Sequence, residues 1–160
     1  MREPVDAFIA LGANLGDPVQ ALTHAMAMVG GLPHTHITRH SSFYRSAPVE
    51  ATGPDYVNAV IAVSTCLCAP DLLEQLQKIE QSAGRERSTR NAPRTLDLDV
   101  LLFGSARIDS PALTVPHPRM TQRAFVLYPL AEIAPEWTEM AHSPGMAAQR
   151  IARIERSMPP

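Results

Sequence analysis

The sequence predicts an α+β fold: a ferredoxin-like βαββαβ core, in which an antiparallel sheet carries the helices on one face, followed by a C-terminal extension. Segments whose apolar residues alternate with period two, typical of strands, are interleaved with two segments that have the 3.6-residue period of amphipathic helices. Over the first hundred residues their order is strand, helix, strand, strand, helix, strand, as in the split βαβ motif. The length of 160 residues supplies a real core, so we expect residues 1–160 to form one domain.

Turn and capping residues bound the elements of this core. Asp17 is a good N-cap, and Pro18 suits the first helical position because its missing N–H would have no partner there. Gly30-Gly31 ends this helix, and Gly84 ends the next. The expected elements are a strand over 7–13, a helix over 18–29, strands over 35–46 and 55–65, a helix over 70–84 and a strand over 96–103.

The C-terminal extension is less regular. We expect a turn or short hairpin over 104–110, and then a proline-stiffened segment that presents His117. Residues 123–133 predict a short helix that carries Phe125. Residues 146–154 predict a weak amphipathic helix with a packing role.

The last core strand combines an apolar face with two carboxylates. Alternation places Asp97 and Asp99 together, on the face opposite Leu96, Leu98 and Val100. Two carboxylates on one face repel each other, so a positive group should compensate them. Mg²⁺ is one candidate, because it usually takes one or two carboxylates together with substrate phosphates.

An arginine-rich segment directly upstream is the other candidate. Arg85, Arg87, Arg90 and Arg94 stand among Gly, Ser, Thr, Asn and Pro, which predicts a loop. Guanidinium groups match phosphate oxygens in a two-pronged geometry, so the loop predicts a phosphate clamp beside a metal site. A solvated strand face beside a solvated basic loop would give the same pattern, and spacing alone does not separate the two.

A polar residue also interrupts the third strand. Asn58 stands among Val57, Ala59 and Val60, and an amide in such a strand needs hydrogen-bond partners. Neighbouring backbone or a bound ligand would each satisfy it.

Charge and hydropathy exclude several classes of protein. The formal net charge is −2, with 14 Lys and Arg against 16 Asp and Glu, which argues against nucleic acid as the main partner. There is no run of 18 apolar residues and no signal-peptide pattern, so we expect no membrane association and a cytoplasmic location. No large apolar stripe is left for a subunit interface, so we expect a monomer.

Three sequence blocks occur in a distinctive order. They are Phe-Tyr-Arg-Ser at 43–46 with Asp-Tyr-Val-Asn-Ala at 55–59, then Pro-Arg-Thr-Leu-Asp-Leu-Asp at 93–99, then Val-Pro-His-Pro at 115–118 with Arg-Ala-Phe at 123–125. Together they resemble the 6-hydroxymethyl-7,8-dihydropterin pyrophosphokinase family, and the likeness runs over about residues 8–137. Three blocks in order are more specific than any one of them.

The resemblance implies an ATP-dependent diphosphokinase of folate biosynthesis. Such an enzyme transfers pyrophosphate from ATP to 6-hydroxymethyl-7,8-dihydropterin and releases AMP. The resemblance further implies two Mg²⁺ ions with ATP as co-substrate, and a product that passes to dihydropteroate synthase.

Individual positions take roles from the same resemblance. Asp97 and Asp99 would hold the metal ions and, with Arg85 and Arg94, form the catalytic set. Tyr56 and Phe125 would lie on the two faces of the pterin ring. The residues expected to contact ATP are Glu80, Arg85, Arg87, Arg94, His117 and Arg123; those expected around the pterin are Ser46, Ala47, Val49, Tyr56, Asn58 and Phe125.

Two positions depart from the pattern of some family members: Asn91 stands where they have Trp, and Pro118 where they have Tyr. Neither change touches the expected metal or ring contacts.

The alternative functions are those of an RNA-recognition module, a regulatory ligand-binding domain and a different metal-dependent nucleotidyltransferase. The first lacks its aromatic motif here, and the second would leave the two aspartates idle.

Overall fold

The structure is a computed structural model that describes residues 3–14, 16–47, 54–84, 96–147 and 149–154. Its strands are β1 (Val5–Ala13), β2 (Thr35–His40), β3 (Tyr44–Ser46), β4 (Tyr56–Thr65), β5 (Asp97–Phe103), β6 (Ile108–Asp109), β7 (Thr114–Val115) and β8 (Ile151–Arg153). Its helices are α1 (Pro18–Gly30), α2 (Ala69–Gly84), η1 (Met120–Gln122), α3 (Ala124–Ile133), η2 (Pro135–Trp137), α4 (Thr138–Ala141) and α5 (Pro144–Ala147).

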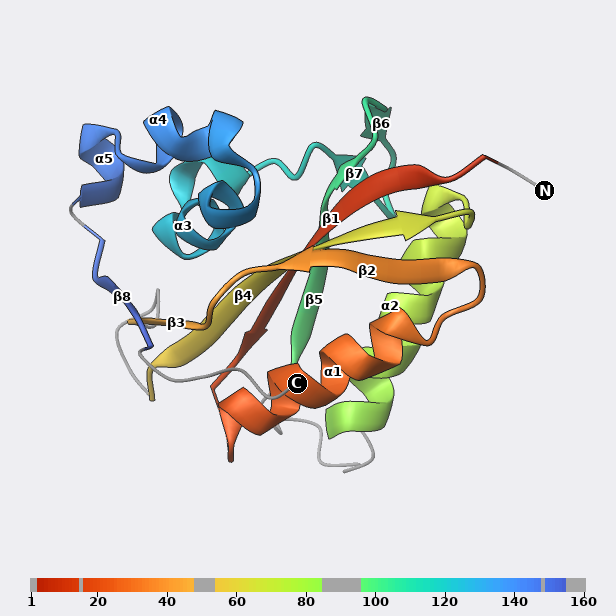
Figure 1. The fold of residues 1–160 in the computed structure, drawn as a ribbon, viewed down its shortest axis with the longest axis horizontal. Helices are drawn as coiled ribbons and strands as arrows, with labels where there is room; N and C mark the ends of the chain where they lie inside the picture. Colours follow the sequence, from red (N-terminus) through yellow and green to blue (C-terminus); the bar gives the residue numbers. More distant parts are fainter. Residues whose placement is uncertain (1–2, 15, 48–53, 85–95, 148, 155–160) are drawn as a thin grey trace.

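One antiparallel sheet forms the centre of the molecule (Figure 1). In the described residues its order is β5-β1-β4-β3-β8, with β2 also paired to β4. Each neighbouring pair is antiparallel. The short strands β6 and β7 pair separately, so the hairpin expected after residue 104 extends to Val115. The prediction of an α+β fold with an antiparallel sheet is confirmed.

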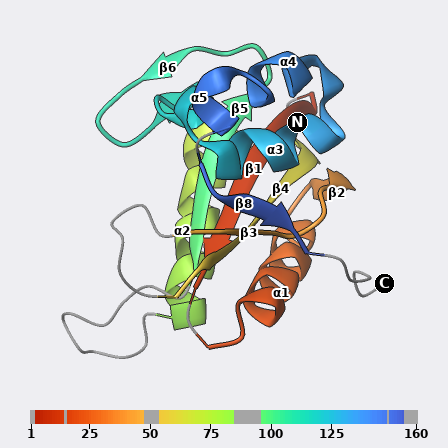
Figure 2. The same cartoon turned by 90° about the vertical axis from the view of Figure 1, so that its left-hand side faces the viewer.

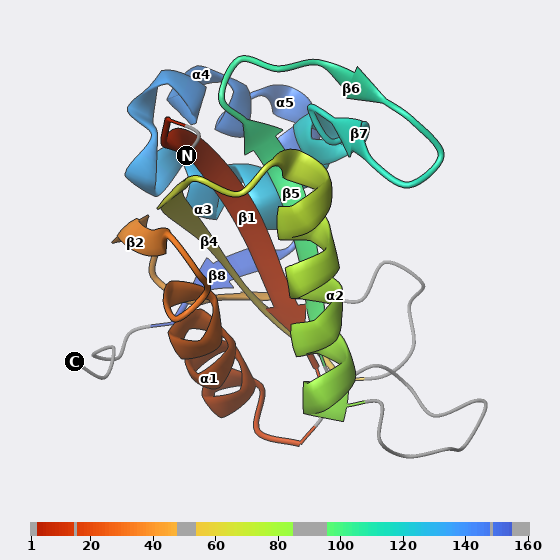
Figure 3. The same cartoon turned by 90° about the vertical axis from the view of Figure 1, so that its right-hand side faces the viewer.

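The helices α1 and α2 pack side by side on one face of this sheet (Figure 3). α1 begins as predicted, since the Asp17 side chain accepts a hydrogen bond from Gln20 N at 3.2 Å. Both helices bury an apolar stripe at helical spacing, which forms the larger core cluster with the inward residues of β1, β4 and β5. The stripes are Leu22, Ala25, Met26 and Val29 on α1, and Leu72, Leu76 and Ile79 on α2.

The opposite face of the sheet is covered in part by α3 (Figure 1). Leu127 and Leu130 pack there against Val60 on β4 and Leu101 on β5, in a second core cluster. The expectation that helices cover one face alone therefore holds for α1 and α2 but not for the extension. None of the helices in the described residues is both long and apolar enough to span a membrane.

The segment predicted as one strand over 35–46 forms two strands, β2 and β3. Between them the chain leaves the regular ladder but stays anchored to β4 through Ser41. Its N–H donates to Val60 O at 2.9 Å, and its hydroxyl accepts from Val60 N at 3.0 Å. This anchor lets the chain turn out of register and still bring Ser46 back alongside β4.

The predicted helix over 146–154 is wrong. α5 ends at Ala147, and β8 pairs with the outer edge of β3, with Ser46 opposite Ile151 (Figure 2). Ile154 N also donates to Phe43 O at 2.8 Å. An unpaired strand edge offers a row of backbone partners, and these outweigh a weak helical periodicity.

Candidate active site

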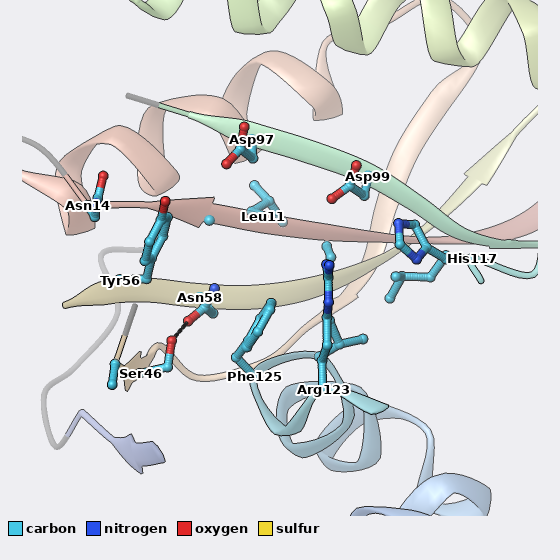
Figure 4. A pocket seen from close by; sticks show the side chains of 15 residues that line it. Leu11, Asn14, Ser46, Tyr56, Asn58, Asp97, Asp99, His117, Arg123 and Phe125 are labelled. Carbon is cyan, nitrogen blue, oxygen red and sulfur yellow. Dashed lines mark hydrogen bonds between the residues drawn. The ribbon is translucent and has the colours of Figure 1, made fainter. Parts of the chain in front are cut away.

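A cavity of about 290 Å³ opens on the part of the sheet face that α3 leaves uncovered (Figure 4). Its walls come from β1, β4 and β5 of the sheet, from Ser46 and Ala47 at the end of β3, and from the segment that leads into α3. Ligand pockets usually begin near this size, at roughly 300 Å³. The cavity is therefore large enough for a small ring system.

Asp97 and Asp99 line this cavity from β5, as the alternation predicted. Leu98 between them is buried in the α1–α2 core. A β-bulge follows, because β1 pairs Ile9 with Val100 and Phe8 with Leu102, which leaves Leu101 as an extra residue on β5. The two aspartates therefore lie just before the point at which the regular pairing of β1 with β5 is interrupted.

His117 is anchored to this bulge. The backbone N–H of His117 donates to the Leu101 carbonyl at 3.0 Å. The ring nitrogen Nδ1 accepts from the backbone N–H of Arg119 at 3.2 Å. The neutral ring therefore carries its proton on Nε2. Burial lowers the pKa of His117; the Asp99 charge opposes this, and Arg123 and Arg119 reinforce it. The side chain is thus a neutral N–H donor beside the carboxylates.

Arg123 supplies a positive charge on the other side of the cavity, directly before α3. Its guanidinium carbon lies 5.4 Å from the centroid of the Phe125 ring, within the range of a cation–π contact. Figure 4 shows the side chain extending from α3 toward Asp99 and His117. The contact with Phe125 couples the position of the cation to that of the ring.

Two aromatic side chains and two polar ones form the remaining wall. Tyr56 comes from β4 and Phe125 from α3, and they flank Asn58 in Figure 4. The Ser46 hydroxyl donates to Asn58 Oδ1 at 2.6 Å, and each of these two residues is only 5% exposed. The sequence left two kinds of partner open for Asn58, neighbouring backbone and a bound ligand. The structure supplies a different one, the side chain of Ser46, and Asn58 also lines the cavity.

The acidic pair fits Mg²⁺ bound together with a polyphosphate. In the described part of the chain, no group of three or more His, Cys, Asp or Glu side chains could hold a metal ion. Asp97 and Asp99 alone would leave most coordination positions to substrate oxygens and water. That ligand set is the one Mg²⁺ usually takes, whereas Zn²⁺ sites use three or four protein ligands.

The structure brings most of the predicted site residues together. Those that line the cavity are Ser46, Ala47, Tyr56, Asn58, Asp97, Asp99, His117, Arg123 and Phe125. Four of the predicted residues, Val49, Arg85, Arg87 and Arg94, lie outside the described residues, as does Asn91. Glu80 does not line the cavity; its Oε2 accepts from Leu98 N at 2.7 Å, so its expected contact with ATP stays a prediction.

Sequence reasoning missed several residues that line the cavity, two of them near the end of β1. Gly12 in β1 and Asn14 directly after it both line the cavity. Neither residue was among those predicted for the site from the sequence. The available signal was a polar residue directly after a buried strand, at the end of the sheet where the acidic strand begins.

The fold and the cavity define a class: an α+β domain that can bind a flat ring next to a cluster of acidic and basic groups. The sequence profile described as 7,8-dihydro-6-hydroxymethylpterin-pyrophosphokinase (HPPK) matches residues 8–135. The chain belongs to this family, as the sequence blocks indicated.

Individual relatives agree with this assignment. The chain is 47% identical over 131 residues to the 2-amino-4-hydroxy-6-hydroxymethyldihydropteridine pyrophosphokinase of Haemophilus influenzae, covering 81% of this chain and 82% of that one. It is 48% identical over 130 residues to the protein of the same name from Pseudomonas aeruginosa, covering 81% and 80%.

A solved structure shows the same fold. A Plasmodium falciparum HPPK-DHPS chain superposes with a TM-score of 0.72 at 13% identity. The match covers 88% of this chain but only 43% of that one, so the present chain spans less than half of the Plasmodium protein.

Proposed function

We propose that this protein transfers pyrophosphate from ATP to 6-hydroxymethyl-7,8-dihydropterin, giving the pterin diphosphate and AMP, as the names of its relatives indicate for them. The observation that carries the proposal is that one cavity contains both residues suited to a polyphosphate and residues suited to a flat ring. Asp97, Asp99, His117 and Arg123 suit a polyphosphate, and the Tyr56–Phe125 slot suits a flat heteroaromatic ring.

In the proposed reaction the pterin hydroxyl oxygen attacks the β-phosphorus of ATP. A new O–Pβ bond forms, the bond between Pβ and the oxygen bridging to Pα breaks, and that oxygen leaves with AMP. The hydroxyl proton is lost to solvent. Negative charge grows on the bridging and non-bridging oxygens, so donors fixed at those positions lower the barrier.

The chain supplies such donors from opposite walls of the cavity. The neutral His117 ring donates through Nε2–H, and its orientation is set by the Arg119 N–H on Nδ1. Arg123 donates from the α3 side and is held by its contact with Phe125. Two Mg²⁺ ions, held by Asp97 and Asp99, would neutralise triphosphate charge when bound.

Further parts of the proposal concern residues and partners beyond the cavity wall. We propose that Val49 completes the pterin pocket, and that Arg85, Arg87, Arg94 and Glu80 act on ATP. A downstream dihydropteroate synthase would take the product, in keeping with the joined HPPK-DHPS name of the Plasmodium protein. We also propose a monomer in the cytoplasm.

The strand order supports a finer description of the fold. We propose a ferredoxin-like core, since β5-β1-β4 with β2 and β3 on the far side of β4 is the arrangement in which a split βαβ unit would pair. The open face of that core holds the cavity.

The decisive experiment follows the nucleotide product. The protein is incubated with Mg-ATP and 6-hydroxymethyl-7,8-dihydropterin, and products are separated by ion-exchange chromatography. We expect AMP and a pterin diphosphate in equal amounts, both abolished by a chelator. ADP would indicate single phosphoryl transfer, and inorganic pyrophosphate with an adenylated pterin would indicate nucleotidyl transfer; either result would overturn the proposal.

A further inference from the structure

The start of α3 is tied to the C-terminal part of the chain by a side chain that the proposed reaction does not use. The Gln149 amide makes two hydrogen bonds to the backbone there. Its Oε1 accepts from the N–H of Ala124 at 2.9 Å, and its Nε2 donates to the carbonyl of Gln122 at 2.9 Å. These two residues flank Arg123 in the chain. We call this pair of hydrogen bonds the Gln149 bridge.

The bridge satisfies a backbone group that the helix itself cannot. Ala124 is the first residue of α3, and the N–H groups of the first helical turn have no partner within the helix. In the described part of the chain, the side chain of the N-cap residue Arg123 makes no capping hydrogen bond. Ala124 is also buried, so water does not replace the missing acceptor. Gln149 supplies the acceptor from 25 positions later.

Arg123 is the joint between two helical segments. η1 ends at Gln122 and α3 begins at Ala124, and Arg123 between them is extended, with φ −123° and ψ 114°. Because a side-chain amide is planar, binding the carbonyl before the joint and the N–H after it restricts the backbone at Arg123. A reversed amide would set donor against donor and acceptor against acceptor, so one orientation of Gln149 is favoured.

Gln149 is itself held on both sides along the chain. Its N–H donates to the carbonyl of Met146 at 3.1 Å, and the side chain of Met146 is buried in the smaller core cluster. Two residues after Gln149, Ile151 begins β8 and pairs with Ser46 on β3. The bridge therefore joins Arg123 to the packed part of the molecule.

Arg123 lines two cavities, and Gln149 lines only one of them. The first is the site cavity, where Figure 4 shows Arg123 extending toward Asp99 and His117. The second is a cavity of about 510 Å³ whose described lining includes both Arg123 and Gln149. An unrestrained Arg123 would have room to turn into the second cavity. Since Gln149 does not line the first, its effect on a ligand there has to pass through Arg123.

We propose that Gln149 is a positioning residue, whose bridge across the joint at Arg123 holds the guanidinium group toward the polyphosphate. This inference rests on the proposed function, because it takes the ligand of Arg123 to be the triphosphate of ATP. It also gives the C-terminal segment a part in nucleotide binding, although none of its side chains would touch the nucleotide.

A double-mutant cycle separates positioning from a general effect on stability. Affinity for α,β-methylene-ATP with Mg²⁺ is measured by calorimetry for the wild type, Gln149→Met, Arg123→Ala and the double variant. Methionine nearly conserves the volume of glutamine but offers no amide. If Gln149 acts through Arg123, its substitution should matter only while Arg123 is present. No turnover is needed, so the result does not depend on whether AMP is formed.

We expect Arg123→Ala to weaken binding about thirtyfold, the size of one hydrogen bond between charged groups. Gln149→Met should weaken it about fivefold, since the arginine is present but no longer held. In the Arg123→Ala background, Gln149→Met should change the affinity by less than about twofold. Gln77→Met replaces an exposed glutamine on α2 that is not among the described residues lining either cavity, and should leave the affinity unchanged.

A more conservative variant provides a partial rescue. Gln149→Glu keeps the acceptor for the N–H of Ala124 and loses the donor to Gln122, so its affinity should lie between those of Gln149→Met and the wild type. If Gln149→Met does not fold, as judged by circular dichroism, the same cycle with Gln149→Glu decides.

The proposal is overturned if the substitution at Gln149 leaves the affinity unchanged, or if it causes the same loss with and without Arg123. A protein that shows the coupling but forms no AMP would refute the proposed reaction and leave the bridge intact. A protein that forms AMP without the coupling would refute the bridge alone. Absence of binding to the wild type would overturn both.

Discussion

At the scale of single residues, Asp97 and Asp99 are the positions where substitution should most clearly impair activity without impairing folding. Asp97 is partly buried and Asp99 exposed, and neither belongs to a core cluster. We expect Asp97→Asn and Asp99→Asn to fold normally but to lose roughly 100-fold or more in kcat, comparable to the loss of one preorganised electrostatic contact. Asp109→Asn on β6 is the control. Steady-state kinetics with near-normal turnover for either site variant at saturating Mg²⁺ would remove the metal assignment.

The two aromatic residues should act on one substrate only. Tyr56→Ala and Phe125→Ala are each expected to weaken pterin binding by about 1–2 kcal/mol through lost stacking and buried area. Affinity for an ATP analogue alone should hardly change. Tyr128→Ala, which removes a ring that contacts His142 at a tilt of 31° outside the cavity, is the matched control. Equal losses for both ligands in calorimetry would argue against a ring-binding slot.

At the scale of elements, the hydrogen bond from β5 to α2 should matter for the acidic pair. Glu80 on α2 accepts the N–H of Leu98, which stands between the two aspartates. We expect Glu80→Ala to raise the Mg²⁺ concentration that gives half-maximal activity, because the strand is held less firmly. Glu80→Gln keeps an acceptor for the Leu98 N–H and should keep the Mg²⁺ requirement of the wild type. If both variants lose activity alike and the Mg²⁺ requirement is unchanged, the charge of Glu80 acts on ATP directly.

The attachment of α3 to β3 predicts a pH dependence. Burial alone would raise the pKa of Glu132, but hydrogen bonds from Ser42 N–H, from the Tyr44 hydroxyl and from the Ser42 hydroxyl, with the Arg153 charge, lower it below its ordinary value of 4.5. A carboxyl with a lowered folded-state pKa stabilises the fold fully above its ordinary pKa, and loses this as pH falls through the folded value. Glu132→Gln should therefore show a weaker loss of unfolding free energy on acidification.

The same attachment has an alkaline counterpart. Burial and the neighbouring Glu132 raise the pKa of Tyr44 well above its ordinary value of 10.0. The neutral phenol is thus favoured in the folded state, so its contribution is present below that ordinary value and declines as pH rises above it. Tyr44→Phe should flatten the alkaline side of the profile. Urea titrations across pH measure both sides, and parallel wild-type and variant profiles would contradict the assignment.

At the scale of the whole molecule, the surface predicts a single chain in solution. Among the described residues, Met140 is the one large apolar side chain that is exposed, at 41%. Stable dimers need a larger apolar patch than one side chain. We expect light scattering after size exclusion to give the mass of one chain at every concentration tested. A mass that rises with concentration would contradict this.

Most of this architecture could be predicted from local patterns. The Asp17 cap, the α1 and α2 stripes and the alternation around Leu98 each arise within a few residues of sequence. The bulge at Leu101 and the pairing of β8 with β3 could not, because both depend on partners far along the chain. The place of Gly12 in the cavity lining was missed for the same reason: it lies opposite Asn58, 46 positions later, across a strand pair.

Residues on the two faces of the sheet should be under selection for different properties, stability on one face and ligand binding on the other. Its α1–α2 side holds the larger core cluster, and its α3 side holds the smaller cluster that borders the cavity. Substitutions under α1 should change how long the protein survives in a cell, without changing what it binds. Under a pterin-competitive inhibitor, we therefore expect resistance to arise among residues 120–133 and at the ends of β3 and β4. The α1–α2 side would contribute only compensating changes that restore abundance.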